Sequence, residues 1–222
     1  MKESQGFISG DLNFLLLPGA PPFPGPTSVT YESLVHWLCG HDVSPAIADI
    51  LGRSSELPNN GLFIAPHEPR ILNKLAYPLR NAKGCYLLGN YLATIALCGY
   101  VAEMVATLLL ELALPSEPSK NFDRLGQSQR IARLRSLGWL TREDARRFML
   151  VSKIRNNYLH VWSEDHDHAR TDAASVFDIA VSLVVFGLGL SVSNSKLTLR
   201  PGFVEYLRQR GVFRPSAPDA IG

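Results

Sequence analysis

Apolar residues in the middle of the chain recur at the period of an α-helix. Between residues 69 and 86 they are spaced by three and four positions, which places them on one helix face. Pro78 lies inside this pattern and predicts a kink or a division of the helix. Gly89-Asn90 predicts the next break. From Tyr91 to Leu114 the sequence is apolar on almost every side, which is typical of a helix at the centre of a bundle.

Three further helices are expected before residue 194. The first is a basic amphipathic helix from Phe122 to Leu137. Thr141 and Asp144 are spaced as a capping box at the start of the second, which runs from Arg142 to about Tyr158, and the third extends from Ala169 to about Val192. The expected inward residues are Leu125, Ile131, Leu134 and Leu137, then Ala145, Phe148, Met149, Val151 or Ser152, and Ile154 or Arg155, then Val176, Ile179, Ala180, Leu183 and Val184. The pattern predicts an all-α fold, an antiparallel bundle of four to five helices.

Both flanks of this bundle have a different pattern. Residues 1–65 contain a proline-rich run at 18–26, which cannot hold a helix, followed by two short apolar helices and a short strand or extended link at 61–65. Residues 195–222 predict a short strand and then a helix that begins at Pro201 and ends before Gly211. We therefore expect an N-terminal arm with accessory helices at 1–65, a helical bundle at 66–194 and an extension at 195–222.

Charge is unevenly distributed along the 222 residues, although the net charge is only +2. From Lys120 to Arg147 there are eight basic and three acidic residues, a local +5, so the remainder sums to −3. This segment indicates a localised anionic partner, and a solvated arginine-rich face is the alternative. The arginines that could guide an RNA backbone are Arg130, Arg133, Arg142, Arg146 and Arg147.

The cysteine and hydropathy patterns bear on localisation. Cys39, Cys85 and Cys98 are odd in number and form no CxxC pair, which argues against a disulfide framework and favours a reducing compartment. No signal-peptide pattern is present at the N-terminus. The apolar segments 85–102 and 173–193 approach the length of a membrane span, but the first contains a Gly-Asn break and the second an aspartate. We expect bundle helices, no membrane partner and a cytoplasmic protein.

Two groups of residues resemble metal sites. His160, His166 and His168 lie near three acidic residues, but a solvated loop that leads into the next helix explains them better. Two histidines and a cysteine lie at 36–41, without a second Cys or His pair nearby. No metal or other cofactor is therefore expected.

The motif with the most specific chemistry is Arg155-Asn156 followed by His160. Histidine can accept or donate a proton near neutral pH, arginine can compensate phosphorane charge, and asparagine can orient the scissile group. Together they suffice for metal-free cleavage of RNA. Arg155 and His160 are separated by five residues, about 140° around an ideal helix. Either the helix ends between them or the site combines residues from two subunits.

Glu103 is the only charged residue between Lys83 and Glu111, inside the most apolar helix. Because a lone carboxylate in such a helix needs a partner, we expect an ion pair with Arg155 that would hold the guanidinium in one pose. The alternative is a purely structural pair, with His160 acting only as a cation at the end of its helix.

The chain resembles HEPN domains over about residues 69–192. The stretch from Ala82 to Glu103, with its Leu88-Gly89-Asn90-Tyr91 break and internal glutamate, is similar to their paired first helices. Arg155-Asn156-x3-His160 is similar to their R-x4–6-H motif. The resemblance implies a helical bundle, usually dimeric. Many such domains are metal-independent ribonucleases of toxin or antiviral systems, and others only bind nucleotides or partner proteins.

From these observations we assign expected roles. Arg155, Asn156, His160 and Glu103 form the catalytic group. Tyr158, Trp162, Arg146 and Arg147 are the expected substrate-binding residues, although core packing explains the two aromatic residues equally well. The expected partners are RNA, a second copy of the chain, and a cognate antitoxin or regulatory protein.

Overall fold

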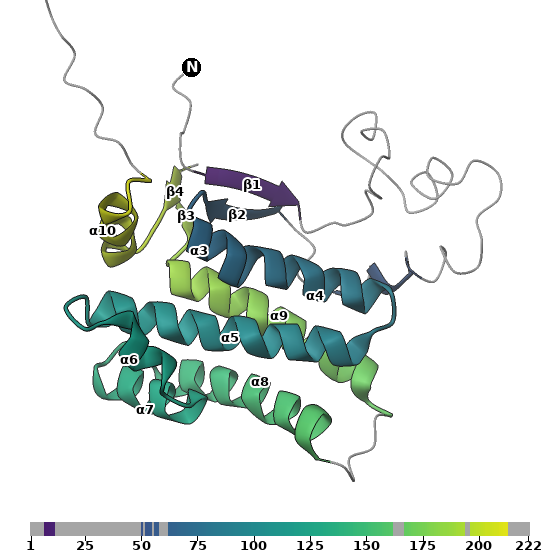
Figure 1. Cartoon of the computed structure of the whole chain (residues 1–222). Coiled ribbons are helices and arrows are strands. Elements are labelled where there is room, and N and C mark those ends of the chain that lie inside the picture. Colours follow the sequence, from purple (N-terminus) through teal and green to yellow (C-terminus); the bar gives the residue numbers. More distant parts are fainter. Residues whose placement is uncertain are drawn as a thin grey trace, which may run out of the picture.

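The computed structural model describes residues 7–11, 50, 52–54, 56–57, 62–161, 167–193 and 196–212. Within these ranges the chain is predominantly helical, which confirms the predicted all-α class (Figure 1). The elements in chain order are β1 (Phe7–Asp11), β2 (Leu62–Pro66), α3 (Pro69–Ile71), the π-helical turn η1 (Leu72–Ala76), α4 (Tyr77–Leu87), α5 (Tyr91–Ala113), α6 (Ser119–Asp123), α7 (Gln127–Ser136), α8 (Arg142–His160), α9 (Ala169–Leu188), β3 (Ser191–Ser193), β4 (Lys196–Thr198) and α10 (Pro201–Gln209).

Helix α5 is the centre of the bundle. It packs against α4, α7, α8 and α9, so most of its surface faces other helices (Figure 1). By length and composition alone, α5 and α9 could each cross a membrane. In the structure, however, 61% and 50% of their most apolar windows are buried against the rest of the chain. This is how a helical bundle accommodates helices that are apolar on almost every side.

Two predicted helix starts are confirmed by their caps. Asn90 caps α5, because its Oδ1 accepts a hydrogen bond from the Ala93 N–H at 3.2 Å. The preceding Gly89 has a φ of 80°, a left-handed conformation that few other residues adopt. At α8, the Asp144 N–H donates to Thr141 Oγ1 and the Thr141 N–H donates to Asp144 Oδ2, both at 3.1 Å, which is the predicted capping box.

The distortion expected at Pro78 is a π-helical turn instead of a break. Residues 72–76 form η1, which ends two positions before the proline. Proline has no N–H, and its ring crowds the carbonyl four residues earlier. A wider turn relieves that crowding and lets α3, η1 and α4 continue as one rod.

The predicted helix over 122–137 is wrong as a single element. It is divided into α6 and α7, because Gly126 is extended (φ −69°, ψ 160°) and caps α7. Leu137 and Met149, expected inward, are exposed. Helix α9 ends at Leu188 and not at residue 192, because Gly189 takes a left-handed conformation with a φ of 63°.

Short antiparallel strand pairs connect the bundle with its flanks. β1 pairs with β2, with Phe7 opposite Pro66, and β3 pairs with β4, with Ser191 opposite Thr198. The strand expected at 61–65 is thus present as β2. These pairs extend across the predicted limits at 65/66 and 194/195, and the division into three parts stays a prediction. Helix α10 packs back against α5.

Candidate functional site

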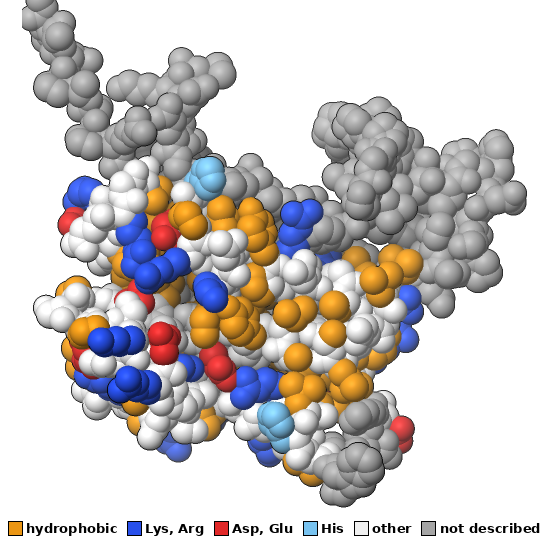
Figure 2. All heavy atoms as spheres, viewed as in Figure 1, with side chains coloured by type: hydrophobic (Ala, Val, Ile, Leu, Met, Phe, Trp, Pro, Cys, Tyr) orange, Lys and Arg blue, Asp and Glu red, His pale blue; other side chains and the backbone are white. Residues whose placement is uncertain are grey.

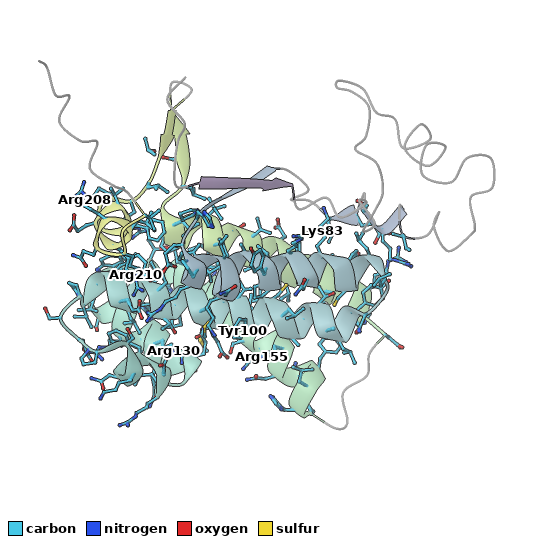
Figure 3. The ribbon with its side chains drawn as sticks, turned by 45° about the horizontal axis from the view of Figure 1, so that its top comes forward. Lys83, Tyr100, Arg130, Arg155, Arg208 and Arg210 are labelled. Atoms are coloured by element: carbon cyan, nitrogen blue, oxygen red, sulfur yellow. The ribbon has the colours of Figure 1, made fainter. Side chains whose placement is uncertain are left out.

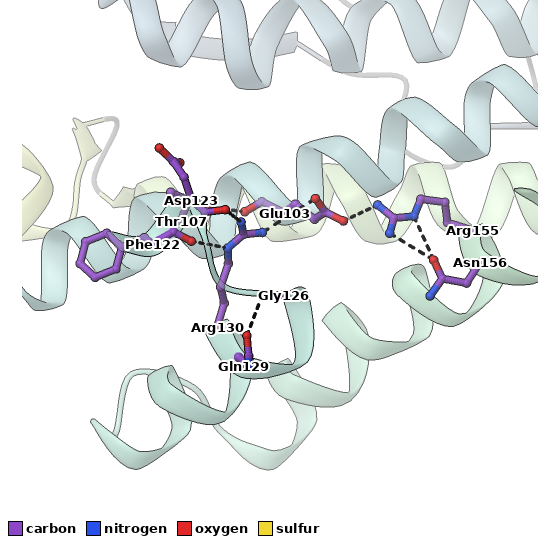
Figure 4. A network of polar contacts seen from close by, with 9 residues as sticks. All are labelled: Glu103, Thr107, Phe122, Asp123, Gly126, Gln129, Arg130, Arg155 and Asn156. Atoms are coloured by element: carbon purple, nitrogen blue, oxygen red, sulfur yellow. Dashed lines mark hydrogen bonds and ion pairs between the residues drawn. The ribbon is translucent and has the colours of Figure 1, made fainter. Parts of the chain in front are cut away.

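Glu103 binds two arginines at the surface of α5. Arg155 Nη1 of α8 donates a hydrogen bond to Glu103 Oε1, so the expected ion pair is present (Figure 4). Arg130 Nη1 of α7 lies 3.8 Å from Glu103 Oε2. The side chains of Glu103 and Arg155 are 25% and 21% exposed, so water reaches the pair. One carboxylate thus joins three helices and keeps a positive cluster near the surface.

Asn156 orients the Arg155 guanidinium from the other side. Its Oδ1 accepts hydrogen bonds from Arg155 Nε at 3.3 Å and from Nη2 at 3.1 Å (Figure 4). With the bond to Glu103, three of the five guanidinium N–H groups are used. Among the described residues, the second N–H groups of Nη1 and Nη2 have no partner, and guanidinium N–H groups are suited to phosphate oxygens.

Gly99 makes room for the stem of Arg155. A Cβ atom at position 99 would lie 2.4 Å from Arg155 Cδ, closer than a Cβ atom can approach, and 3.1 Å from Cγ, which is a tight contact. Only glycine therefore lets the arginine lie across α5 in this pose. The sequence signal was a glycine one turn before the lone glutamate.

Arg130 is the site residue that sequence analysis placed only among the RNA-guiding arginines. Its side chain is 7% exposed, and Nε donates to the Phe122 carbonyl at 3.1 Å while Nη2 donates to the Asp123 carbonyl at 3.4 Å. These bonds hold the end of α6 against the Glu103 cluster. The signal that could have found it is its place beside Ile131, on the inward face of α7.

His160 does not join Arg155 within one chain. Both residues are in α8, which continues to His160, so the alternative of a helix end between them is wrong. Five residues of α-helix separate them by about 140° around the axis and about 7.5 Å along it. His160 and Asn156 are exposed. The alternative that remains is a site combined from two subunits.

The expected substrate-binding residues are not gathered at one point. Tyr158 is buried, and its hydroxyl donates to Asp172 Oδ2 at 2.7 Å, which favours core packing over contact with a base. Arg146 and Arg147 are exposed on α8, where both pair with a glutamate in its first turn at 3.4 Å and 3.8 Å. Trp162 lies outside the described residues.

Potential metal ligands are not clustered in the part of the chain that the structure describes. Within it, no group of three or more His, Cys, Asp or Glu side chains is arranged to hold a metal ion. The histidine-containing stretch at 36–41 and His166 lie outside the described ranges.

Neither a protein-family model, nor a curated protein, nor a solved structure matches this chain. The resemblance to HEPN domains therefore depends on the residues that carry it, from Ala82 to Glu103 and from Arg155 to His160.

Proposed function

We propose that this protein is a metal-independent endoribonuclease of HEPN type with a role in a toxin or antiviral defence system. The observation that carries the proposal is the Arg155 guanidinium. Glu103 and Asn156 hold it in one orientation, and the Arg155 side chain is still 21% exposed. A fixed guanidinium that is still accessible is suited to a phosphate with developing negative charge.

The proposed reaction is transesterification within the RNA. The 2′-oxygen attacks the adjacent phosphorus, the bond from phosphorus to the 5′-oxygen breaks, and a 2′,3′-cyclic phosphate and a 5′-hydroxyl result. Arg155 would bind the non-bridging oxygens, and Asn156 would hold the arginine. His160 would accept the 2′-hydroxyl proton or donate a proton to the leaving oxygen.

A second copy of the chain would bring His160 to an Arg155 site. A two-fold arrangement pairs Arg155 of one copy with His160 of the other, and it does so twice. The exposed apolar side chains of Leu88, Leu159 and Val161 support this contact. Helices α4 and α8 terminate at the same end of the bundle (Figure 1), and the three residues are within two positions of those helix ends in sequence. Exposed apolar side chains favour association. A cognate antitoxin or regulatory protein would restrain the nuclease.

One observation favours a different class of function. An ion pair of Glu103 with Arg155, and a histidine at the last position of α8, are also what a purely structural arrangement would contain. The chain would then be a non-catalytic module that binds a nucleotide or a partner protein. Cleavage assays separate the two classes.

The test is incubation of the purified chain with mixed RNA in excess EDTA. Wild type should cleave and leave 2′,3′-cyclic phosphate ends, whereas His160→Ala should lose the activity by about 10²-fold or more. His67→Ala is the matched control, because His67 is also exposed but lies beside β2. Cleavage that EDTA abolishes, or that His160→Ala retains, would contradict the proposal. The absence of any cleavage would favour the non-catalytic module.

A further inference from the structure

A cavity of about 350 Å³ lies directly beside the Glu103 cluster. It opens between α3, η1, α5, α6 and α10, and two of its lining residues are hydrogen-bonded to residues of the cluster through backbone carbonyls. Thr107 Oγ1 donates to the Glu103 carbonyl at 3.0 Å, and the Asp123 carbonyl accepts from Arg130 at 3.4 Å. The cavity therefore adjoins the candidate site along α5 and α6.

Tyr100 and Met104 provide a flat aromatic surface and a polarisable thioether in this cavity. Tyr100 precedes Glu103 by three residues, about 4.5 Å along α5. Figure 3 labels Tyr100, Arg130 and Arg155 in the same part of the bundle. A group that packs against Tyr100 would thus lie within one helical turn of Glu103, the residue that binds Arg155.

Lys74 adds a positive charge at the same cavity. Its Nζ lies 6.0 Å from the centre of the Tyr100 ring, and among the described residues it has no ion-pair partner. Arg70, the other cation in the lining, pairs with Glu111 at 3.5 Å. In Figure 2, acidic and basic side chains gather at the left, over α6, α7, α10 and the end of α5. The half over α4 and the start of α5 is mostly uncharged.

The lining also contains two carboxylates. Glu111 is already paired with Arg70, and Arg210 lies 4.0 Å from its other oxygen. The carboxylate of Asp123 would repel a phosphate at the α6 side but could accept a hydrogen bond from an amino group of a base. Within the cavity, the charges therefore favour a phosphate beside Lys74 and a planar polar group beside α6.

From this arrangement we propose that the cavity binds the base of an RNA nucleotide next to the scissile phosphate, packed against Tyr100 and Met104, with the following phosphate on Lys74. The proposal rests on the proposed ribonuclease function and adds a subsite to it. The volume falls in the usual range of pockets that enclose a small planar ligand. Tyr100 and Lys74 then help to determine which RNA position is cut.

The test uses a fluorescent 2′-O-methyl RNA oligonucleotide, which can bind but cannot be cleaved because its 2′-oxygen is blocked. Tyr100→Leu and Lys74→Ala should each weaken binding by on the order of tenfold. Lys74→Ala should also reduce the slope of log affinity against log salt by about 0.7. Arg135→Ala is the control, because Arg135 is an exposed cation of α7 away from the cavity, and it should bind like wild type.

The outcomes separate the subsite from the enzyme activity. Equal binding by wild type and both variants, no binding by wild type, or loss confined to Lys74→Ala would each overturn the subsite. Parallel assays with unmodified RNA test the activity. A wild-type chain that binds as expected but cleaves nothing would refute the ribonuclease and keep the subsite. A chain that cleaves, with KM and cut positions unchanged in both variants, would refute the subsite alone.

Discussion

Replacement of Gly99 by alanine should displace Arg155 without removing any charge or hydrogen-bonding group. The new Cβ would stand 2.4 Å from Arg155 Cδ, 3.1 Å from Cγ and 3.3 Å from Cβ. Because the contacts begin at the Cβ of the arginine, rotation of its far end cannot relieve them. The stem of the arginine, or the distance between α5 and α8, must change.

The expected loss of stability is small, and the expected loss of activity is large. Alanine in place of a helical glycine stabilises by about 0.5–1 kcal/mol. Overpacking costs about 1–3 kcal/mol, so the free energy of unfolding should fall by roughly 0–2.5 kcal/mol. A misplacement of about 1 Å at a catalytic group costs on the order of 10²-fold in rate, and this is the loss of RNA cleavage that we expect for Gly99→Ala.

The assay measures cleavage in EDTA and thermal unfolding of the same samples. Gly84→Ala is the matched control, since Gly84 lies within α4 and a Cβ there would meet nothing within 4 Å. It should be slightly stabilised and fully active. If Gly99→Ala behaved like Gly84→Ala in both measurements, Arg155 would not need its position against α5 and the reasoning would be refuted.

Three other changes have defined outcomes. Glu103→Gln should lower cleavage. A double-mutant cycle of unfolding free energies should give a coupling energy of about 1–3 kcal/mol between Glu103 and Arg155, less than for a fully buried pair because water reaches both side chains. A coupling energy near zero would show that the two residues do not interact. Arg170 holds the pKa of Glu56 below its ordinary 4.5, so the ionised carboxylate stabilises the fold above pH 4.5, and this contribution is lost as the pH falls through the lowered pKa. Glu56→Gln should therefore make Tm less dependent on pH in the acid range. An unchanged dependence would refute the linkage. Tyr158→Phe should cost about 0.5–1.5 kcal/mol of unfolding free energy and leave cleavage unchanged, whereas loss of cleavage without loss of stability would indicate contact with RNA.

The sequence predicted elements whose signals are local. The capping box of Thr141 and the Gly89-Asn90 break depend on residues within one turn, and both appear in the structure as expected. The limits of α5 follow from the composition of a single stretch. The partner of Glu103 was predictable for a related reason, because an isolated carboxylate in an apolar helix needs a cationic side chain close to it.

The features that the sequence did not predict depend on contacts between segments distant in sequence, or on the backbone conformation of a single residue. Gly126 could have remained within a helix, but its extended conformation divides α6 from α7. The antiparallel partners Phe7 and Pro66 are far apart in sequence, and no local pattern reveals such a pair. Arg130 was not predicted as a site residue, because a basic residue was expected to face water. In the structure it is buried, where an α6 carbonyl accepts its hydrogen bond and Glu103 forms an ion pair with it.

The most direct test of the central claim, a ribonuclease site combined from two copies, is a complementation experiment. Arg155→Ala and His160→Ala chains, each inactive alone, are mixed, allowed to exchange subunits and assayed on RNA in EDTA. Random exchange makes half of the dimers mixed, and each mixed dimer has one intact site out of two, so activity should return to about one quarter of the wild-type level. A mixture that stays as inactive as its components, beside an active wild type, would contradict the account.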